Sequence, residues 1–220
     1  TITWKNDQGG TIDTTEVAYG TVPTHADPTK DPTSEHSYVF AGWNPAPSAV
    51  DGEATYTATF TETERTYTIT WKNDQGGVID TTQVAYGQTP THADPTKEET
   101  AQYSYTFEKW TPDIVSVTGD ATYTASFTQT TQVYGVYWYN DGGGCIDSGT
   151  WQYGQTPSYT GETPTKDSSP EFDYTFDKWS PDVVPVTGVA HYTATYKATR
   201  RSYTIPWNDD QDNLIDTTTV

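Results

Sequence analysis

The chain repeats itself along its length. The string TITWKNDQGGTIDTTEVAYG at residues 1–20 returns almost unchanged at residues 68–87, a shift of 67 positions. It returns in more diverged form at residues 135–154, and a fourth copy begins at Tyr203 and stops at Val220. A repeat of this kind is one supersecondary unit, stacked in tandem. The sequence therefore predicts repeat 1 at residues 1–66, repeat 2 at 67–133, repeat 3 at 134–202, and the first hairpin of an incomplete fourth repeat at 203–220.

Within each copy, apolar residues alternate with polar ones. In repeat 2, Tyr67, Ile69 and Trp71 fall on one face of an extended segment, and in the closing segment Tyr123 and Ala125 do the same. A period of two is typical of strands with one buried face, and helical spacing is almost absent. The pattern predicts a mainly β fold, with roughly four strands in each repeat and little or no helix.

Turn and breaker residues set the expected strand boundaries. The Asn-Asp-Gln-Gly-Gly run at residues 73–77 predicts a hairpin turn into a second strand at residues 78–86. Pro90 and Pro95 break the stretch that follows, which has room for at most one short helical turn near His92.

The sequence also predicts the character of other stretches in and between the strands. Trp110 breaks the alternation of the third strand, which predicts a bulge or a strand end near residues 108–109. Repeat 3 has two extra residues within 157–164, so this segment is predicted to be a loop. The connectors at 61–66 and 128–132 contain neither Gly nor Pro and continue a β-like pattern, so we expect a semi-rigid array.

Charge and composition argue against several classes of protein. The chain has 11 basic and 30 acidic residues and a formal net charge of −19, which argues against a nucleic-acid partner. It has no run of about 18 apolar residues, so no membrane insertion is expected, and no charged-then-apolar stretch within it reads as a signal peptide. It has no Met and begins at Thr1 within a strand-like pattern, so we expect a segment of a longer protein.

Aromatic residues are expected to form the cores. Hydrophobic residues make up 32% of the chain, yet it contains 8 Trp, 17 Tyr and 6 Phe, which repay the entropy of ordering small units. Tryptophans recur at equivalent positions and are predicted inside; they are Trp4, Trp71, Trp138 and Trp207 in one set and Trp43, Trp110 and Trp179 in another. Only Trp151, in the place of Val17 and Val84, is singular. The single Cys145 excludes an intrachain disulfide, which suits an exported protein, and is predicted to be a small core residue.

The motifs of one copy form a joint pattern. In repeat 2 they are Tyr86-Gly87, Pro95-Thr96-Lys97, Tyr105-Thr106-Phe107, Trp110, and Ala121 to Phe127. With matching positions in repeats 1 and 3, this pattern resembles the Listeria-Bacteroides repeat, the group that includes the internalin B-repeat. The resemblance implies a small β-grasp-like domain of mixed strands, strung in tandem in large secreted or wall-attached bacterial surface proteins as stalk or adhesive repeats. It implies no catalytic residues.

No catalytic, cofactor-binding or metal site is predicted. The titratable residues that recur are Asp7, Asp13 and Lys30, Asp74, Asp80 and Lys97, and Asp141, Asp147 and Lys166. No nucleophile and base recur as a pair, and the four histidines are not placed alike in all copies; they are His25, His36, His92 and His191. The chain is therefore predicted not to be an enzyme.

Two groups of polar residues could carry chemistry, but each also has a structural explanation. The acidic turns at residues 73–75 and 208–213 offer oxygen ligands to calcium, but a solvated hairpin turn explains them without a metal. Lys30, Lys97 and Lys166 could crosslink to an Asn or Asp only if buried and neutral. Their polar and acidic flanks predict instead an exposed lysine that caps a loop.

These expectations combine into one functional reading. The sequence predicts a non-catalytic repeat segment of a large bacterial surface or secreted protein, located outside the cell, that acts as a stalk, a spacer or an adhesive array. The alternatives are a glycan-binding array, which would need an exposed aromatic patch in each unit, and a subunit segment of an extracellular filament. Expected partners are the neighbouring repeats, a host or cell-surface protein or glycan, and a second copy through residues 203–220.

Overall fold

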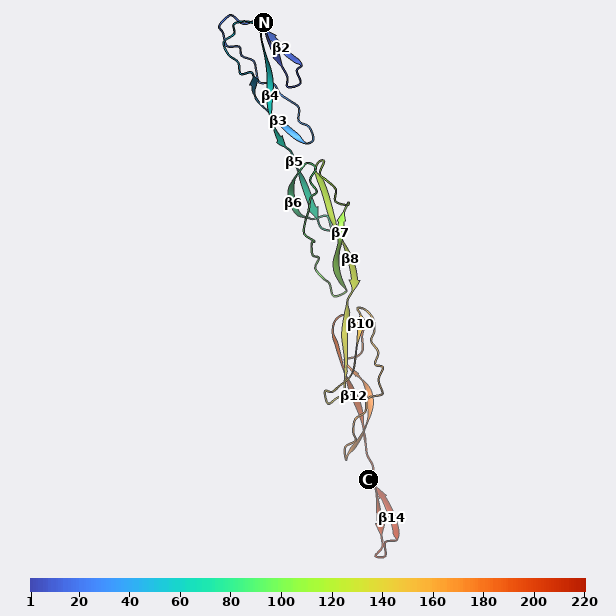
Figure 1. Ribbon diagram of the computed structural model, residues 1–220. Helices are drawn as coiled ribbons and strands as arrows, with labels where there is room; N and C mark the ends of the chain where they lie inside the picture. Colours follow the sequence, from blue (N-terminus) through green and yellow to red (C-terminus); the bar gives the residue numbers. More distant parts are fainter. The chain divides into compact units, whose positions relative to one another are not determined.

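A computed structural model describes all 220 residues, and it contains fourteen strands and no helix (Figure 1). The strands of repeat 1 are β1 (Ile2–Lys5), β2 (Thr11–Thr15), β3 (His36–Asn44) and β4 (Ala54–Glu64). Those of repeat 2 are β5 (Thr66–Lys72), β6 (Val78–Ala85), β7 (Tyr103–Thr111) and β8 (Ala121–Thr131). Those of repeat 3 are β9 (Val133–Tyr139), β10 (Cys145–Gln152), β11 (Phe172–Ser180) and β12 (Ala190–Arg200), and the chain ends with β13 (Thr204–Asn208) and β14 (Leu214–Thr219).

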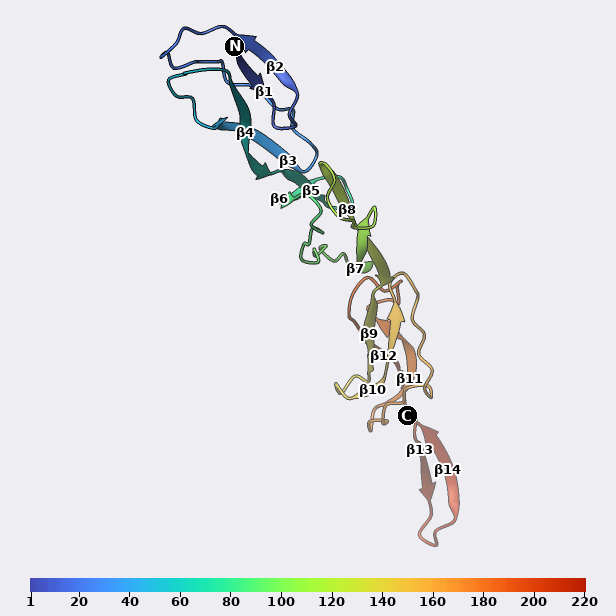
Figure 2. The same ribbon diagram turned by 45° about the horizontal axis from the view of Figure 1, so that its top comes forward.

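Three sheets have the same four-stranded topology. Their strand orders are β2-β1-β4-β3, β6-β5-β8-β7 and β10-β9-β12-β11. The first and last strands of each repeat are central and parallel, as the turned view of β1 and β4 shows (Figure 2), and the second strand is an antiparallel edge. The predicted mainly β array of four-stranded units is confirmed, as is the hairpin that opens each unit.

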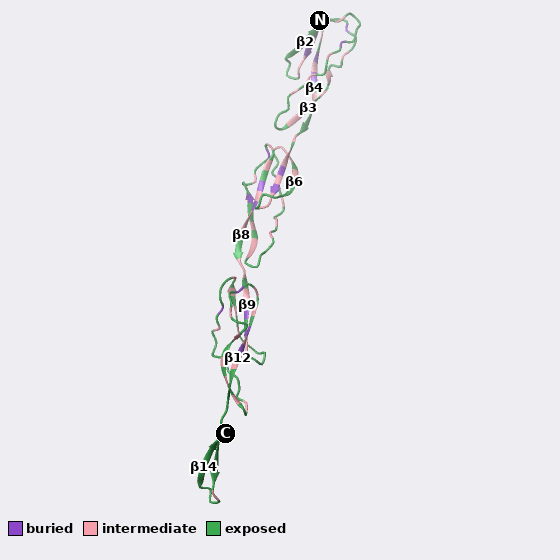
Figure 3. Ribbon diagram, turned by 180° about the vertical axis from the view of Figure 1, so that it is seen from behind, coloured by how far each residue is buried: buried purple, intermediate pink, exposed green.

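Alternation decides which residues are buried. In the second sheet Ile69 and Trp71 on β5 are 0% exposed, and Tyr123 and Ala125 on β8 are also buried, as the period of two predicts. Trp110 lies with them in one hydrophobic cluster. Buried residues lie mainly on the inner strands of the sheets, whereas β14 is exposed throughout (Figure 3).

The hairpin turn is held by its own side chain. Asn73 Oδ1 accepts hydrogen bonds from the N–H groups of Gln75 and Gly77, at 3.1 and 2.8 Å. Gly76 has a φ of 83°, a conformation that favours glycine. The predicted turn is therefore present, and its glycine and asparagine each have a structural task.

Repeats 1 and 3 have a bulge in the third strand. The pairing of β3 with β4 shifts between Phe40 and Gly42, and that of β11 with β12 shifts between Phe176 and Lys178. These positions are equivalent to the bulge predicted in repeat 2. The proline-broken segment contains no helix; Gly87 N–H and Val117 N–H instead form two backbone hydrogen bonds, to Val117 O and Gln88 O, that tie its start to the loop before β8.

The chain divides into two compact units. The first contains residues 1–96 and 107–128, and therefore the whole of the first sheet together with β5 and β6. The second contains residues 97–106 and 129–220, and therefore the third sheet and the last hairpin. As predicted, β13 and β14 form a sheet of two strands only. The prediction that Trp207 lies inside is wrong: it is 56% exposed, because no third or fourth strand covers this hairpin.

Candidate functional site

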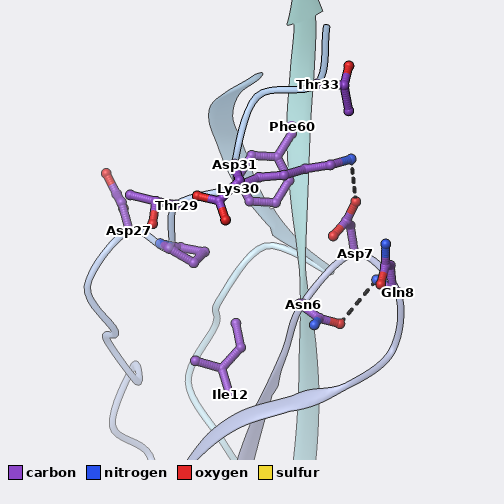
Figure 4. A pocket seen from close by; sticks show the side chains of 11 residues that line it. Asn6, Asp7, Gln8, Ile12, Asp27, Thr29, Lys30, Asp31, Thr33 and Phe60 are labelled. Atoms are coloured by element: carbon purple, nitrogen blue, oxygen red, sulfur yellow. Dashed lines mark hydrogen bonds and ion pairs between the residues drawn. The ribbon is translucent and has the colours of Figure 1, made fainter. Parts of the chain in front are cut away.

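The most developed polar arrangement is built on a recurring lysine. In repeat 1, Lys30 Nζ donates a hydrogen bond of 2.8 Å to Asp7 Oδ2 in the hairpin turn, in a pocket that also includes Asn6 (Figure 4). The same ammonium group lies 3.9 Å from the ring centroid of Tyr38 and 5.8 Å from that of Phe60. The side chain of Lys30 is only 26% exposed. The prediction of an exposed lysine is therefore wrong here, because Asp7 and Tyr38 cover it.

Repeat 3 has the same arrangement. Lys166 forms an ion pair with Asp141, the equivalent of Asp7, and lies 4.7 Å from the ring centroid of Tyr174. In repeat 2 the ammonium group of Lys97 lies 4.2 Å from the ring centroid of Tyr105. The lysine that follows Pro-Thr thus stacks on a tyrosine of the third strand in every repeat, and in repeats 1 and 3 it also closes the loop onto the hairpin turn.

Electrostatics make this lysine a cation and not a nucleophile. The hydrogen bond to Asp7 raises the pKa of Lys30 above its ordinary value, and this effect exceeds the opposing effect of burial. Asp141 raises the pKa of Lys166 in the same way. An amide crosslink requires the neutral amine, so the geometry favours an ion pair that joins two loops.

The second recurring arrangement is an aromatic cluster around the first tryptophan. In repeat 1 the Trp4 ring centroid lies 4.7 Å from Trp43, 5.1 Å from Tyr56 and 5.1 Å from His25. Trp4 is 0% exposed. The matching clusters are Trp71, Trp110, Tyr123 and His92 in repeat 2, and Trp138, Trp179, Tyr192 and Tyr159 in repeat 3. These tryptophans are core residues, as predicted.

The histidine of this cluster is a site that sequence reasoning missed. His25 Nδ1 lies 2.7 Å from Ala26 O, its Nε2 lies 3.6 Å from Asp13 Oδ2, and the ring packs between Trp4 and Trp43. His92 repeats these contacts with Asp80, at the same 3.6 Å. In repeat 3 the same slot holds Tyr159. The repeat spacing could have revealed this site, because His25, His92 and Tyr159 follow one another at intervals of 67 positions.

The acidic turns show no metal-binding arrangement. Asp209 replaces the turn asparagine in the last hairpin, and its Oδ1 accepts hydrogen bonds from the N–H groups of Gln211 and Asn213, at 2.9 and 2.8 Å. Hydrogen bonds from Asn213 and Gln211 lower the pKa of Asp209. The structure contains no group of three or more His, Cys, Asp and Glu side chains that could hold a metal ion. The carboxylate of Asp209 therefore binds groups of its own turn.

Cys145 does not lie in the core. It is exposed, and its Sγ lies 3.4 Å from Asp147 O. The equivalent Val78 is itself 61% exposed. The prediction of a small core residue is therefore wrong, because this position begins the second strand just after the turn, where no other element covers it.

Repeat 3 carries an aromatic row on the outer face of its sheet. His191 stacks on Tyr137 with ring centroids 5.1 Å apart and an angle of 13° between the ring planes, and it also stacks on Tyr139 at 5.8 Å. Repeats 1 and 2 have threonine where repeat 3 has Tyr137 and His191. The rings turn their faces toward one another, so the row offers mainly ring edges to solvent.

The comparisons with known proteins are sparse. No protein-family model matches the chain. No curated protein matches it either. A solved structure that is similar to it is described as Streptococcal High Identity Repeats in Tandem (SHIRT) domains 3-4 from a cell surface protein. The similarity has a TM-score of 0.30 and 15% sequence identity, and covers 61% of this chain and 99% of that one. The structure contains no helix that could cross a membrane.

Proposed function

We propose that the chain is a non-catalytic repeat segment of a large bacterial surface or secreted protein, located outside the cell, where it serves as a stalk or spacer that carries mechanical load. The side chains that recur in every repeat support this proposal. The tryptophans fill the cores, the lysines join loops, and the turn residues bond their own backbone. Each of these groups therefore has a structural role.

The observation that carries the proposal is the position of the strands through which the chain enters and leaves each repeat. These strands are neighbours and parallel: β1 with β4, β5 with β8, and β9 with β12. Tension on a repeat pulls its first strand backward and its last strand forward along the same ladder. The hydrogen bonds between them are then loaded together in shear, whereas a hairpin pulled open at its ends loses them one at a time.

Single-molecule force spectroscopy on the full chain tests this proposal. When the chain is held at its two termini, we expect three unfolding events, one for each four-stranded sheet. Each event should release roughly 220 Å of extended chain, the length of one repeat at about 3.3 Å per residue. Extension without discrete events would contradict the proposal.

The exposed thiol of Cys145 provides a matched control. When the chain is held at the N-terminus and at Cys145, force passes through β9 and leaves at the start of β10, so β12 carries no load. We expect the event that belongs to repeat 3 to disappear and the other two to remain. Three unchanged events would refute loading through the parallel pair.

One observation favours a second function, a glycan-binding module. The row of Tyr137, His191 and Tyr139 is an aromatic feature of the kind that stacks on sugars. If it binds glycans, chemical shifts of these three residues should move on titration with soluble oligosaccharides. The double variant Tyr137→Thr and His191→Thr, which restores the residues of repeats 1 and 2, should lose the response. No shift at any concentration would remove this alternative.

We propose three classes of partner: the neighbouring repeats of the same chain, a protein or glycan on a host or cell surface, and a second copy of the chain. The last would dock through residues 203–220, a hairpin that leaves Trp207, Leu214 and Ile215 more than half exposed. Such association would make the chain a segment of an extracellular filament. The net charge of −19 argues against nucleic acid as a partner.

A further inference from the structure

The residue that joins two repeats is hydrogen-bonded on both sides. Arg65 alone separates β4 from β5; its N–H donates to Glu35 O of repeat 1 at 2.8 Å, and its carbonyl accepts from Tyr86 N–H of repeat 2 at 3.0 Å. Gln132 does the same at the next junction, with Gln102 O at 2.8 Å and Tyr153 N–H at 2.9 Å. Rotation about the backbone of such a linker breaks at least one of these two bonds.

A tyrosine two residues after each linker reaches back into the preceding repeat. The hydroxyl of Tyr67 donates to Ser34 O at 2.7 Å. Tyr134 donates to Ala101 O at 2.7 Å, and Tyr203 donates to Pro170 O at 2.6 Å. The acceptor is a main-chain carbonyl at equivalent positions in all three cases, although the side chains there are serine, alanine and proline.

The turn that presents this carbonyl is fixed in advance by a hydroxyl residue. Thr33 Oγ1 accepts the His36 N–H at 3.0 Å, Thr100 Oγ1 accepts the Tyr103 N–H at 2.9 Å, and Ser169 Oγ accepts the Phe172 N–H at 3.0 Å. A local side-chain hydrogen bond of this kind holds a turn in one conformation. The carbonyl is therefore oriented before the tyrosine docks.

We propose that residues 33–35, 100–102 and 169–171 form a junction socket whose partner is the linker and first tyrosine of the following repeat, and that this contact couples neighbouring repeats. Recognition is through the backbone, so the socket of any repeat fits the tyrosine of any other.

The junctions differ in strength. The guanidinium of Arg65 lies 5.2 Å from the ring centroid of Tyr67 and donates to Thr33 O at 2.7 Å, and Arg201 makes the matching contacts at 5.3 and 3.2 Å. Gln132 has no cation to place on Tyr134, and its side-chain amide donates instead to Glu99. The junction between repeats 2 and 3 should therefore open more often than the junction between repeats 1 and 2.

Amide hydrogen exchange on the full chain tests the socket, because the Gln132 N–H bonds Gln102 O within the socket and should be better protected while Tyr134 holds the socket in place. In Tyr134→Phe, which keeps the ring and removes the hydroxyl, exchange at Gln132 should rise roughly five-fold, the loss of one net hydrogen bond. Exchange at Val136, which is fully buried on β9, should not change. Gln132→Arg should slow exchange at residue 132, relative to its intrinsic rate, toward the rate at Arg65.

The matched control is Tyr19→Phe, which removes an exposed hydroxyl and should alter neither junction. Unchanged exchange at Gln132 in Tyr134→Phe would overturn the inference. Equal acceleration at Gln132 and Val136 would also overturn it, because the tyrosine would then stabilise only the fold of its own repeat.

Discussion

Replacing Gly149 by threonine should destabilise repeat 3, although repeats 1 and 2 carry threonine at this position. In those repeats the threonine accepts the indole N–H of the core tryptophan: Trp4 donates to Thr15 at 3.0 Å and Trp71 donates to Thr82 at 3.1 Å. The matching indole N–H in repeat 3 is buried without a hydrogen-bond partner.

The reason lies in a second substitution. Trp151 stands where repeat 2 has valine, and its ring lies over Gly149 and packs against the core cluster. A Cβ added to Gly149 would lie 2.7 Å from Cη2 and Cζ3 of Trp151. The indole of Trp138 therefore lost its acceptor when a large ring took the space of the threonine side chain.

These contacts set the magnitudes. Gly149→Thr alone forces the Trp151 ring aside and should cost about 1–3 kcal/mol, as overpacking does. Trp151→Val alone removes packing and leaves the Trp138 N–H without an acceptor. The double variant relieves the clash and supplies the acceptor, which is worth about 1 kcal/mol. We expect a favourable coupling energy between the two positions of about 2–4 kcal/mol, the relieved clash plus the new hydrogen bond.

Urea unfolding of the parent, both single variants and the double variant gives this coupling energy from one double-mutant cycle. The indole N–H of Trp138 supplies an independent reading, because its exchange with solvent should slow in the double variant only. If the two single effects add to within about 0.5 kcal/mol, the two positions are independent and the reasoning fails.

Four further predictions concern other parts of the chain. Trp110→Ala should destabilise its own sheet by about 3–5 kcal/mol and leave repeat 3 unaffected, as residue-resolved hydrogen exchange would reveal; a parent-like melting curve would show that the ring is not a core residue. The raised pKa of Lys30 means that its ion pair with Asp7 stabilises the fold at neutral pH and is lost as pH rises through that pKa. Lys30→Gln should therefore unfold with a flatter pH dependence above about pH 10, and an unchanged profile would contradict the pairing. His25→Tyr should be tolerated within about 1.5 kcal/mol in thermal melts, because repeat 3 places a tyrosine in the same slot, whereas His25→Ala should cost more. Deleting residues 203–220 should abolish concentration-dependent light scattering, and equal scattering by both forms would show that the hairpin does not mediate association.

Local features of this protein could be predicted from its sequence. The alternation of Ile69 and Trp71 identified a buried face, because successive side chains of a strand point to opposite sides. The Asn-Asp-Gln-Gly-Gly run identified a hairpin turn, because its asparagine bonds and its glycine conformation involve only neighbouring residues. Both features depend on chain geometry within a few positions.

The candidate sites were harder to predict, because the groups involved are distant in sequence. Lys30 meets Asp7 across 23 positions, and Tyr67 meets Ser34 across 33. Neither pair is marked by a spacing that a period of two would reveal. Cys145 was misplaced for a related reason: alternation says that a side chain faces one side of a sheet, but another element must be present to cover it.

The sequence by itself determined the period of the array, the number of strands in each repeat and the aromatic residues of each core, since these follow from local pattern and composition. Only the tertiary structure decided that the last strand of a repeat lies parallel beside the first. Alternation fixes which face of a strand is buried and says nothing about which edge it pairs with. That choice of edge places the entry and exit strands of each repeat on one ladder, and the backbone carbonyls of the turn before the third strand within reach of the next repeat's tyrosine.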